Sequence, residues 1–63
     1  MNDQILQKME LNVGRDVSFP LEDGTFMSGR ITGVSNEDHY TVLVDFHGNP
    51  WDWYVRSEAV RFI

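Results

Sequence analysis

Two histidines and the acidic residues near them are the side chains best suited to catalysis or metal binding. His39 and His47 lie within a few residues of Asp38, Asp45 and Asp52, and a metal site or a carboxylate-oriented histidine base can be drawn from these residue types. No regular ligand spacing joins them, however, and the serines lie outside any Gly-x-Ser-x-Gly context. We therefore expect no enzyme activity, no catalytic residue, no metal site and no cofactor.

The aromatic residues offer a second kind of chemistry, which is recognition. The stretch Tyr40–Val55 holds both tryptophans, both tyrosines and one of the histidines. Trp51 and Trp53 alternate with Asp52 and Tyr54, and successive side chains of a strand point to opposite faces. Because so small a core cannot cover both faces, one pair must meet solvent. Tyr54 has a polar tip that tolerates water, so we expect Tyr54 and Asp52 to face outward and the tryptophans to face inward.

A predicted ligand-binding patch follows from this alternation. We expect Phe26 from another strand and His47 from a turn to join the outward pair, and Asp45 to lie at the edge of the patch. The patch residues are Phe26, His47, Asp52, Tyr54 and Asp45, and the acidic rim consists of Asp45, Asp52, Glu22 and Asp23. Exposed aromatic rings bordered by carboxylates favour basic or arginine-bearing protein segments. A protein partner with such a segment is the expected ligand.

Composition limits the other classes of partner. The chain has 63 residues, no cysteine, ten acidic and five basic residues, and a net charge of −5. This length predicts one domain, and the absence of cysteine leaves no disulfide framework, which favours a cytoplasmic location. The negative charge disfavours direct binding to nucleic acid. No apolar run reaches membrane-spanning length, so we expect no membrane partner.

The first residues predict a short helix. Ile5, Leu6 and Met9 form an apolar stripe in the segment Asn2–Leu11, and Asn2 or Asp3 can cap its N-terminus. We expect residues 1–10 to form a helical arm that packs over an open end of the domain formed by residues 11–63. Docking of the stripe on a partner's helix is the alternative.

Alternating apolar residues and turn signals predict five strands in the rest of the chain. We expect strands at Arg15–Phe19, Thr25–Val34, His39–Phe46, Trp51–Val55 and Val60–Ile63. Gly29 and Gly33 predict a sharp bend in the second strand, and a Gly48–Pro50 turn joins the third to the fourth. Ser57–Ala59 predicts one helical turn capped by Ser57. The last strand is expected to pair with the first and remove the free edge.

These elements predict an all-β fold, a five-stranded SH3-like barrel with a short N-terminal helix and a single helical turn before the last strand. Across residues 11–63 the chain resembles the Tudor family within that fold. The matching segments are Val13–Gly14, Glu22–Phe26, Arg30–Ile31, Val44–Asn49 and Ser57–Arg61. The resemblance implies a Tudor-like barrel, and in the family an aromatic cage reads methylated lysine or arginine.

The cage positions that the resemblance implies are only partly aromatic in this sequence. They correspond to Phe19–Leu21, Phe26 or Met27, Val44 and His47. Since several rings must surround one cation, methyl-lysine or methyl-arginine reading is a less favoured function than binding of a basic segment. Self-association through the aromatic strand or the helix, as a homodimer, is an alternative to an adaptor role. A further alternative is an acidic decoy that occupies the basic groove of a nucleic-acid-binding protein.

Overall fold

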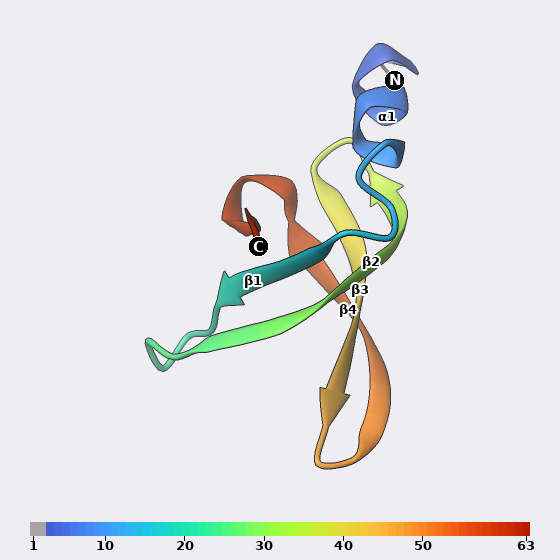
Figure 1. The fold of residues 1–63 in the computed structure, drawn as a ribbon. Helices are drawn as coiled ribbons and strands as arrows, with labels where there is room; N and C mark the ends of the chain where they lie inside the picture. Colours follow the sequence, from blue (N-terminus) through green and yellow to red (C-terminus); the bar gives the residue numbers. More distant parts are fainter. Residues whose placement is uncertain (1–2) are drawn as a thin grey trace.

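The computed structural model describes residues 3–63, which form one antiparallel sheet and one α-helix (Figure 1). The elements in chain order are α1 (Asp3–Glu10), β1 (Asp16–Pro20), β2 (Phe26–Asn36), β3 (His39–Phe46), β4 (Asn49–Arg56), the 3-10 helix η1 (Ser57–Ala59) and β5 (Arg61–Phe62). The predicted all-β class is confirmed, and the third strand has the predicted bounds. Residue 2, which the sequence offers as a helix cap, lies outside the described residues.

The sheet is open, with the strand order β4-β3-β2-β1-β5. The last strand pairs with the first, as predicted, through Val17 opposite Phe62 and Ser18 opposite Arg61. The prediction that this pairing removes the free edge is wrong. Within residues 3–63, β4 and β5 each have a partner on one side only, because β5 is two residues long and bonds to β1 alone.

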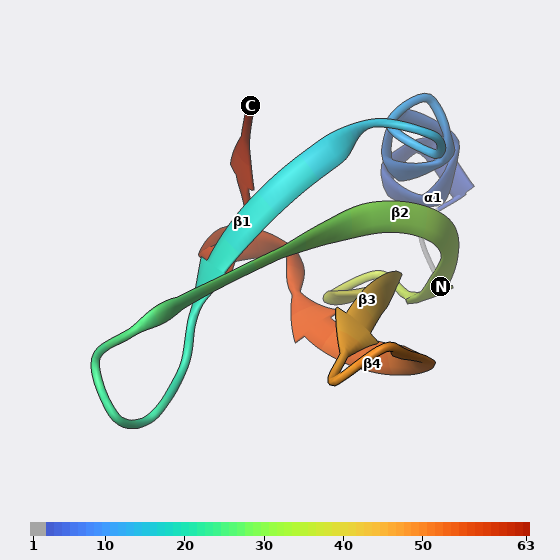
Figure 2. The ribbon, with the colours of Figure 1, turned by 60° about the horizontal axis from the view of Figure 1, so that its bottom comes forward.

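Strand β2 connects the two halves of the sheet and curves strongly between them (Figures 1 and 2). Its pairing with β3 shifts register between Ile31 and Gly33, which is the local irregularity expected where a strand bends. At Gly29 a Cβ atom would lie 2.5 Å from the carbonyl oxygen of Leu43. Glycine at this position therefore lets the backbone of β3 pass directly against β2.

Strands β3 and β4 form a regular hairpin closed by a two-residue turn. Phe46 pairs with Asn49, and His47 and Gly48 between them have φ angles of 53° and 82°. Positive φ at both central residues is typical of a type I′ turn, whose twist matches that of the strands. The predicted hairpin between the third and fourth strands is confirmed, but its turn consists of His47 and Gly48, because Asn49 and Pro50 already belong to β4.

One face of the curved sheet carries the core, which we call the inner face. The buried core residues are Met9, Val17, Phe19, Ile31, Tyr40, Val42, Val44 and Val55. Helix α1 supplies Met9 at one end of this core, while Ile5 of the same predicted stripe is 40% exposed. The side-chain amide of Asn12, just after the helix, donates to the Tyr40 hydroxyl at 2.9 Å. The helix thus packs against the sheet through Met9.

The 3-10 helix η1 turns the chain from β4 toward β5 without a side-chain cap. The predicted capping role of Ser57 is wrong, since η1 has no side-chain cap hydrogen bond and its N-cap residue is Arg56. The backbone N–H of Ser57 instead donates to the carbonyl of Asp38 at 2.7 Å. This long-range hydrogen bond ties the end of β4 to the β2–β3 turn.

Candidate functional site

The register of the β3–β4 hairpin decides which side each aromatic residue occupies. Trp53 lies opposite Val42 and Trp51 lies opposite Val44, and both valines are buried. Directly opposed residues share a face, so both tryptophans lie on the inner face. Tyr54 and its neighbours of the same parity lie on the other side, which we call the outer face.

The outer face brings together three of the five residues of the predicted patch. Asp52 and Tyr54 alternate with the tryptophans, and Asp45 lies opposite Pro50. Tyr54 is 67% exposed. This part of the outer face is an open strand surface that holds two carboxylates and one phenol.

The other two residues of the predicted patch lie elsewhere. Phe26 is the first residue of β2, whereas the pairing of β2 with β3 begins only at Arg30, and the guanidinium of Arg61 lies over the Phe26 ring at 5.8 Å. His47 lies in the tight turn with its ring 4.4 Å from that of Phe46. The β1–β2 loop and the β3–β4 turn are at separate ends of the molecule in both ribbon views (Figures 1 and 2). Phe26 and His47 therefore do not form one patch.

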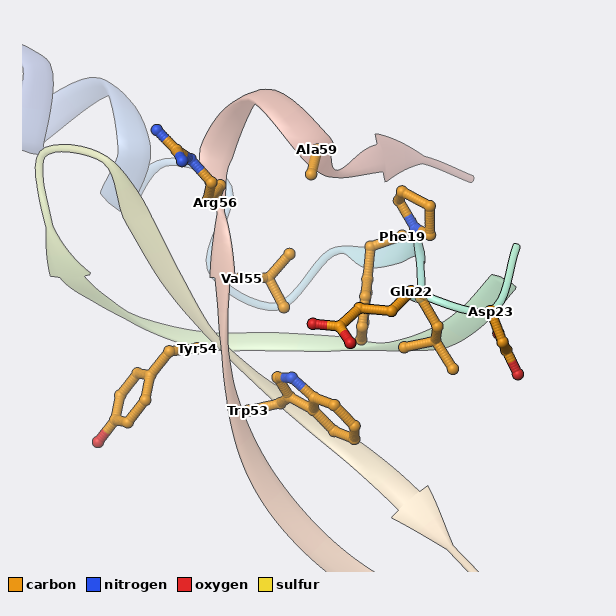
Figure 3. A pocket seen from close by; sticks show the side chains of 10 residues that line it. Phe19, Glu22, Asp23, Trp53, Tyr54, Val55, Arg56 and Ala59 are labelled. Carbon is orange, nitrogen blue, oxygen red and sulfur yellow. The ribbon is translucent and has the colours of Figure 1, made fainter. Parts of the chain in front are cut away.

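A hollow on the inner face combines an apolar floor with acidic groups (Figure 3). Its volume is about 540 Å³, and it lies between the β1–β2 loop, β4 and η1. The lining residues are Phe19, Pro20, Leu21, Glu22, Asp23, Trp53, Tyr54, Val55, Arg56 and Ala59. We call this feature the Trp53 hollow.

Trp53 forms one wall of the Trp53 hollow and is neither fully buried nor free. Its ring lies 6.1 Å from that of Phe19 at an interplanar angle of 58°, which is a favourable tilted arrangement for two aromatic rings. Phe19 behind it is buried, while Trp53 remains 38% exposed. In Figure 3 the Trp53 ring points into the hollow, and the Tyr54 ring points away from it.

The β1–β2 loop holds its shape through its own hydrogen bonds. Leu21 and Thr25 close the loop through a backbone hydrogen bond of 2.8 Å, and Gly24 has a φ angle of 86° that favours glycine. The side-chain hydroxyl of Thr25 donates to the Asp23 carboxylate at 2.6 Å, and the Thr25 backbone N–H donates to the same oxygen at 3.0 Å. These two bonds lower the pKa of Asp23 below 3.8, the hydroxyl having the larger effect.

The charged groups around the hollow leave one carboxylate directed into it. Glu22 extends toward the space between Val55 and Trp53, whereas Asp23 points outward (Figure 3). Arg56 also points away from the floor in this view, and its guanidinium pairs with Glu58 at 3.2 Å. The hollow is therefore an apolar and aromatic surface with an acidic edge.

Two of the exposed aromatic rings already carry an arginine from the chain itself. Arg15 lies 4.2 Å above the Phe62 ring, and Arg61 lies over Phe26. Within residues 3–63 no arginine or lysine of the chain lies over Trp51 or Trp53. The exposed parts of these two rings, 58% for Trp51 and 38% for Trp53, therefore carry no cation from the described residues.

The sequence missed the Trp53 hollow, although some of its elements were visible. Glu22 and Asp23 belong to the predicted acidic rim, but the tryptophans were expected to face inward, away from the predicted patch. The alternation of residues along the strand gives the face on which Trp53 lies. It does not show how much of the ring the β1–β2 loop covers. Of the implied cage positions, Phe19 and Val44 are buried in the core and cannot open onto a cage.

Residues 3–63 contain no cluster of three or more histidine and carboxylate side chains that could hold a metal ion. The same part of the chain contains no helix that is both long and apolar enough to cross a membrane.

No protein-family model, curated protein or solved structure matches this chain.

Proposed function

We propose that this protein is a non-catalytic interaction module that binds a basic, arginine- or lysine-bearing segment of a protein partner in the Trp53 hollow. The observation that carries the proposal is the partly exposed Trp53 ring, which packs against Phe19 and lies on the side toward which the Glu22 carboxylate extends. An aromatic face attracts a cation, and a nearby carboxylate pairs with it. A net charge of −5 adds a long-range attraction for basic partners.

The position of the proposed site differs from the patch that the sequence predicts. A segment crossing the Trp53 hollow contacts the β1–β2 loop, β4 and η1 at once and meets aromatic rings there. The outer face also has a hollow, of about 500 Å³, but no aromatic residue lines it. Concave sites with an apolar floor and a few polar groups favour ligand binding over flat ones. For this reason the inner side of β4 is the better supported surface.

The fold that accompanies this proposal is a Tudor-like member of the SH3-like class, with the barrel left open between β4 and β5. The strand order and the 3-10 helix before the last strand support it. Amide exchange of the monomeric chain, at low protein concentration, checks the open arrangement, because N–H groups on the free edge of β4 should exchange much faster than those of β3. Equal protection of β3 and of every N–H in β4 contradicts it.

Binding of a short arginine peptide tests the function directly. The titrations use ¹H–¹⁵N NMR spectra of the full chain with a peptide carrying one arginine in a neutral sequence, and a matched peptide carrying citrulline in its place. We expect the arginine peptide to shift the signals of Trp53, the β1–β2 loop and η1. The citrulline peptide should bind more weakly, and added salt should weaken only the arginine peptide, since screening acts on charge.

Charge-neutralising variants on the two faces supply the matched control. Glu22→Gln should weaken binding about fivefold, the effect of losing about 1 kcal/mol from an exposed ion pair. Asp45→Asn on the outer face removes the same charge and should leave the affinity unchanged. Trp53→Leu keeps an apolar side chain in the hollow and should still abolish the arginine preference.

The reverse pattern would overturn the proposal. If Asp45→Asn or Tyr54→Ala abolished binding while Glu22→Gln had no effect, the outer patch predicted from sequence would be the binding surface. If no arginine peptide shifted any signal at millimolar concentration, the chain would not be a basic-segment binder of this kind.

A further inference from the structure

The two edges of the sheet differ in their capacity to accept another strand. β5 is two residues long, too short to serve as a template for pairing. β4 has eight residues and, within residues 3–63, pairs only with β3. A long unpaired edge presents a row of backbone donors and acceptors that another strand can join.

The hairpin geometry identifies the backbone groups on the free edge of β4. In a hairpin with a two-residue turn, the residues that flank the turn form a hydrogen-bonded pair, here Phe46 and Asn49. From Asn49 onward, every second residue of β4 bonds to β3, and the backbone groups of the residues between point to the other side. The backbone groups of Pro50, Asp52 and Tyr54 and the N–H of Arg56 accordingly point to the free edge, whereas the Arg56 carbonyl accepts the first hydrogen bond of η1. Proline is tolerated at position 50, because a residue at this position donates no hydrogen bond to β3.

The side chains of β4 are self-complementary about Tyr54. When two copies of β4 pair antiparallel around a two-fold axis at Tyr54, Asp52 of each copy lies opposite Arg56 of the other. A two-fold axis at Asp52 would oppose two like charges, which is destabilising. An axis at Trp53 would bring Pro50, which has no N–H, opposite Arg56. Only the Tyr54-centred arrangement gives both opposite charges and a backbone donor at every paired position.

We propose that the free edge of β4 binds a second copy of this chain, with Tyr54 on the two-fold axis. The two sheets then form one continuous sheet with their inner faces on the same side. On that side Trp53 lies opposite Val55 of the second copy, so the dimer covers part of a tryptophan that is 38% exposed in the single chain. The pairing at Asp52, Tyr54 and Arg56 ends before Pro50 and before η1.

The existing ion pair of Arg56 offers little resistance to this arrangement. Its partner Glu58 is 3.2 Å away, and the two side chains are 67% and 76% exposed. Exposed pairs of this kind contribute little to stability. Arg56 can therefore exchange Glu58 for Asp52 of the second copy at small cost.

Sedimentation equilibrium on the full chain from micromolar to millimolar concentration tests the proposal through a charge exchange. The variants Asp52→Arg and Arg56→Asp each place like charges opposite one another at two symmetric positions. Each should weaken its own dimer by about tenfold or more. A mixture of the two variants restores both opposite-charge pairs and should form a heterodimer about as strong as the wild-type dimer.

Tyr54→Pro is the complementary backbone variant. It removes the N–H at the two-fold axis while leaving the hydrogen bonds between β4 and β3 in place, so the dimer should be lost. Far-UV circular dichroism shows whether each variant still folds, and the exposed charge variants keep the test decisive if the proline variant does not.

Three outcomes would overturn the proposal. The first is a wild-type chain that stays monomeric at millimolar concentration. The second is a dimer that both charge variants form as well as wild type does. The third is a mixture of the two variants that associates no better than either variant alone. None of these outcomes bears on peptide binding in the Trp53 hollow, which is measured with Glu22→Gln.

Discussion

The two faces of β4 differ in how far their side chains are packed and enclosed. On the inner face Trp53 packs on Phe19 and still opens onto a hollow. On the outer face Tyr54 is 67% exposed, and its ring points away from that hollow (Figure 3). The inner face thus combines packing with a concave aromatic surface, whereas the hollow of the outer face is lined by no aromatic ring.

The packing of the inner face also differs along the sheet. At Gly29 it is so tightly packed that a Cβ atom would lie 2.8 Å and 2.9 Å from side-chain carbons of Val42 and Val44. At Trp51, which is 58% exposed, the same face is open. The curvature of β2 brings its inner surface against β3 in the middle of the sheet and leaves the end of the β3–β4 hairpin uncovered.

Gly29→Ala should have the largest effect on stability. The added methyl group would meet the backbone oxygen of Leu43 at 2.5 Å, and backbone cannot move aside without disturbing the sheet. We expect a loss of about 3 kcal/mol in the free energy of unfolding, at the upper end of overpacking costs, measured by urea denaturation.

Gly33→Ala is the matched control for this change. No atom lies within 4 Å of the Cβ position there, so the stability should change by no more than about 0.5 kcal/mol. Equal losses for the two variants would show that β2 does not pass closely against β3 at Gly29.

Trp53→Ala and Tyr54→Ala compare the two faces at neighbouring positions. Trp53→Ala should cost about 2 kcal/mol, less than a fully buried tryptophan because the ring is partly exposed, and Tyr54→Ala should cost less than about 1 kcal/mol. Thermal and urea melts at one low protein concentration check both values without a contribution from dimerisation. A larger loss for Tyr54→Ala would mean that the faces of β4 are assigned the wrong way round.

Thr25→Val, in the β1–β2 loop that borders the Trp53 hollow, should have the smallest effect on stability. It removes the hydroxyl that most lowers the pKa of Asp23, so that pKa should rise toward 3.8. NMR titration of the Asp23 carboxyl carbon measures the shift. Thr32→Val, which removes a hydroxyl that bonds to the Thr41 carbonyl instead, should leave the Asp23 pKa unchanged.

The direction of the associated pH effect follows from the lowered pKa. A carboxyl whose pKa is lower in the folded chain stabilises the fold above its unfolded pKa, here about 3.8. That contribution is lost as the pH falls through the folded pKa. Wild type should therefore lose slightly more stability than Thr25→Val in this acidic range, and an equal loss would contradict a role for the Thr25 hydroxyl.

Local sequence signals predicted the strands better than they predicted whether the sheet closes into a barrel. β3 could be placed from its β-branched residues and the polar turn before it, and its bounds are those predicted. The type I′ turn was missed because histidine does not ordinarily signal a positive φ, whereas Gly-Asn-Pro is a strong turn signal. Whether β4 meets β5 depends on the curvature accumulated along β2, which no local pattern records.

The sequence predicted part of the surface geometry around β4. Alternation separated Trp53 from Tyr54, and the acidic loop was recognised as part of a rim. Assigning Trp53 to a closed core assumed a layer above it, and the β1–β2 loop covers it only in part. Grouping Phe26 with Tyr54 assumed that β2 pairs with β3 along its whole length, yet the pairing begins at Arg30.

The two-residue turn between β3 and β4 also has a consequence for folding kinetics. Its hairpin joins residues that are close in sequence, so forming it closes only a very short loop, whereas Val17 must find Phe62 across most of the chain. The hairpin should consequently form early, with high φ-values at Val42 and Val44, and the β1–β5 pairing should form last. Until β5 pairs, β1 is a second unpaired edge beside β4. We therefore expect chains to associate through either edge during refolding, whereas the folded chain has only one long edge within residues 3–63.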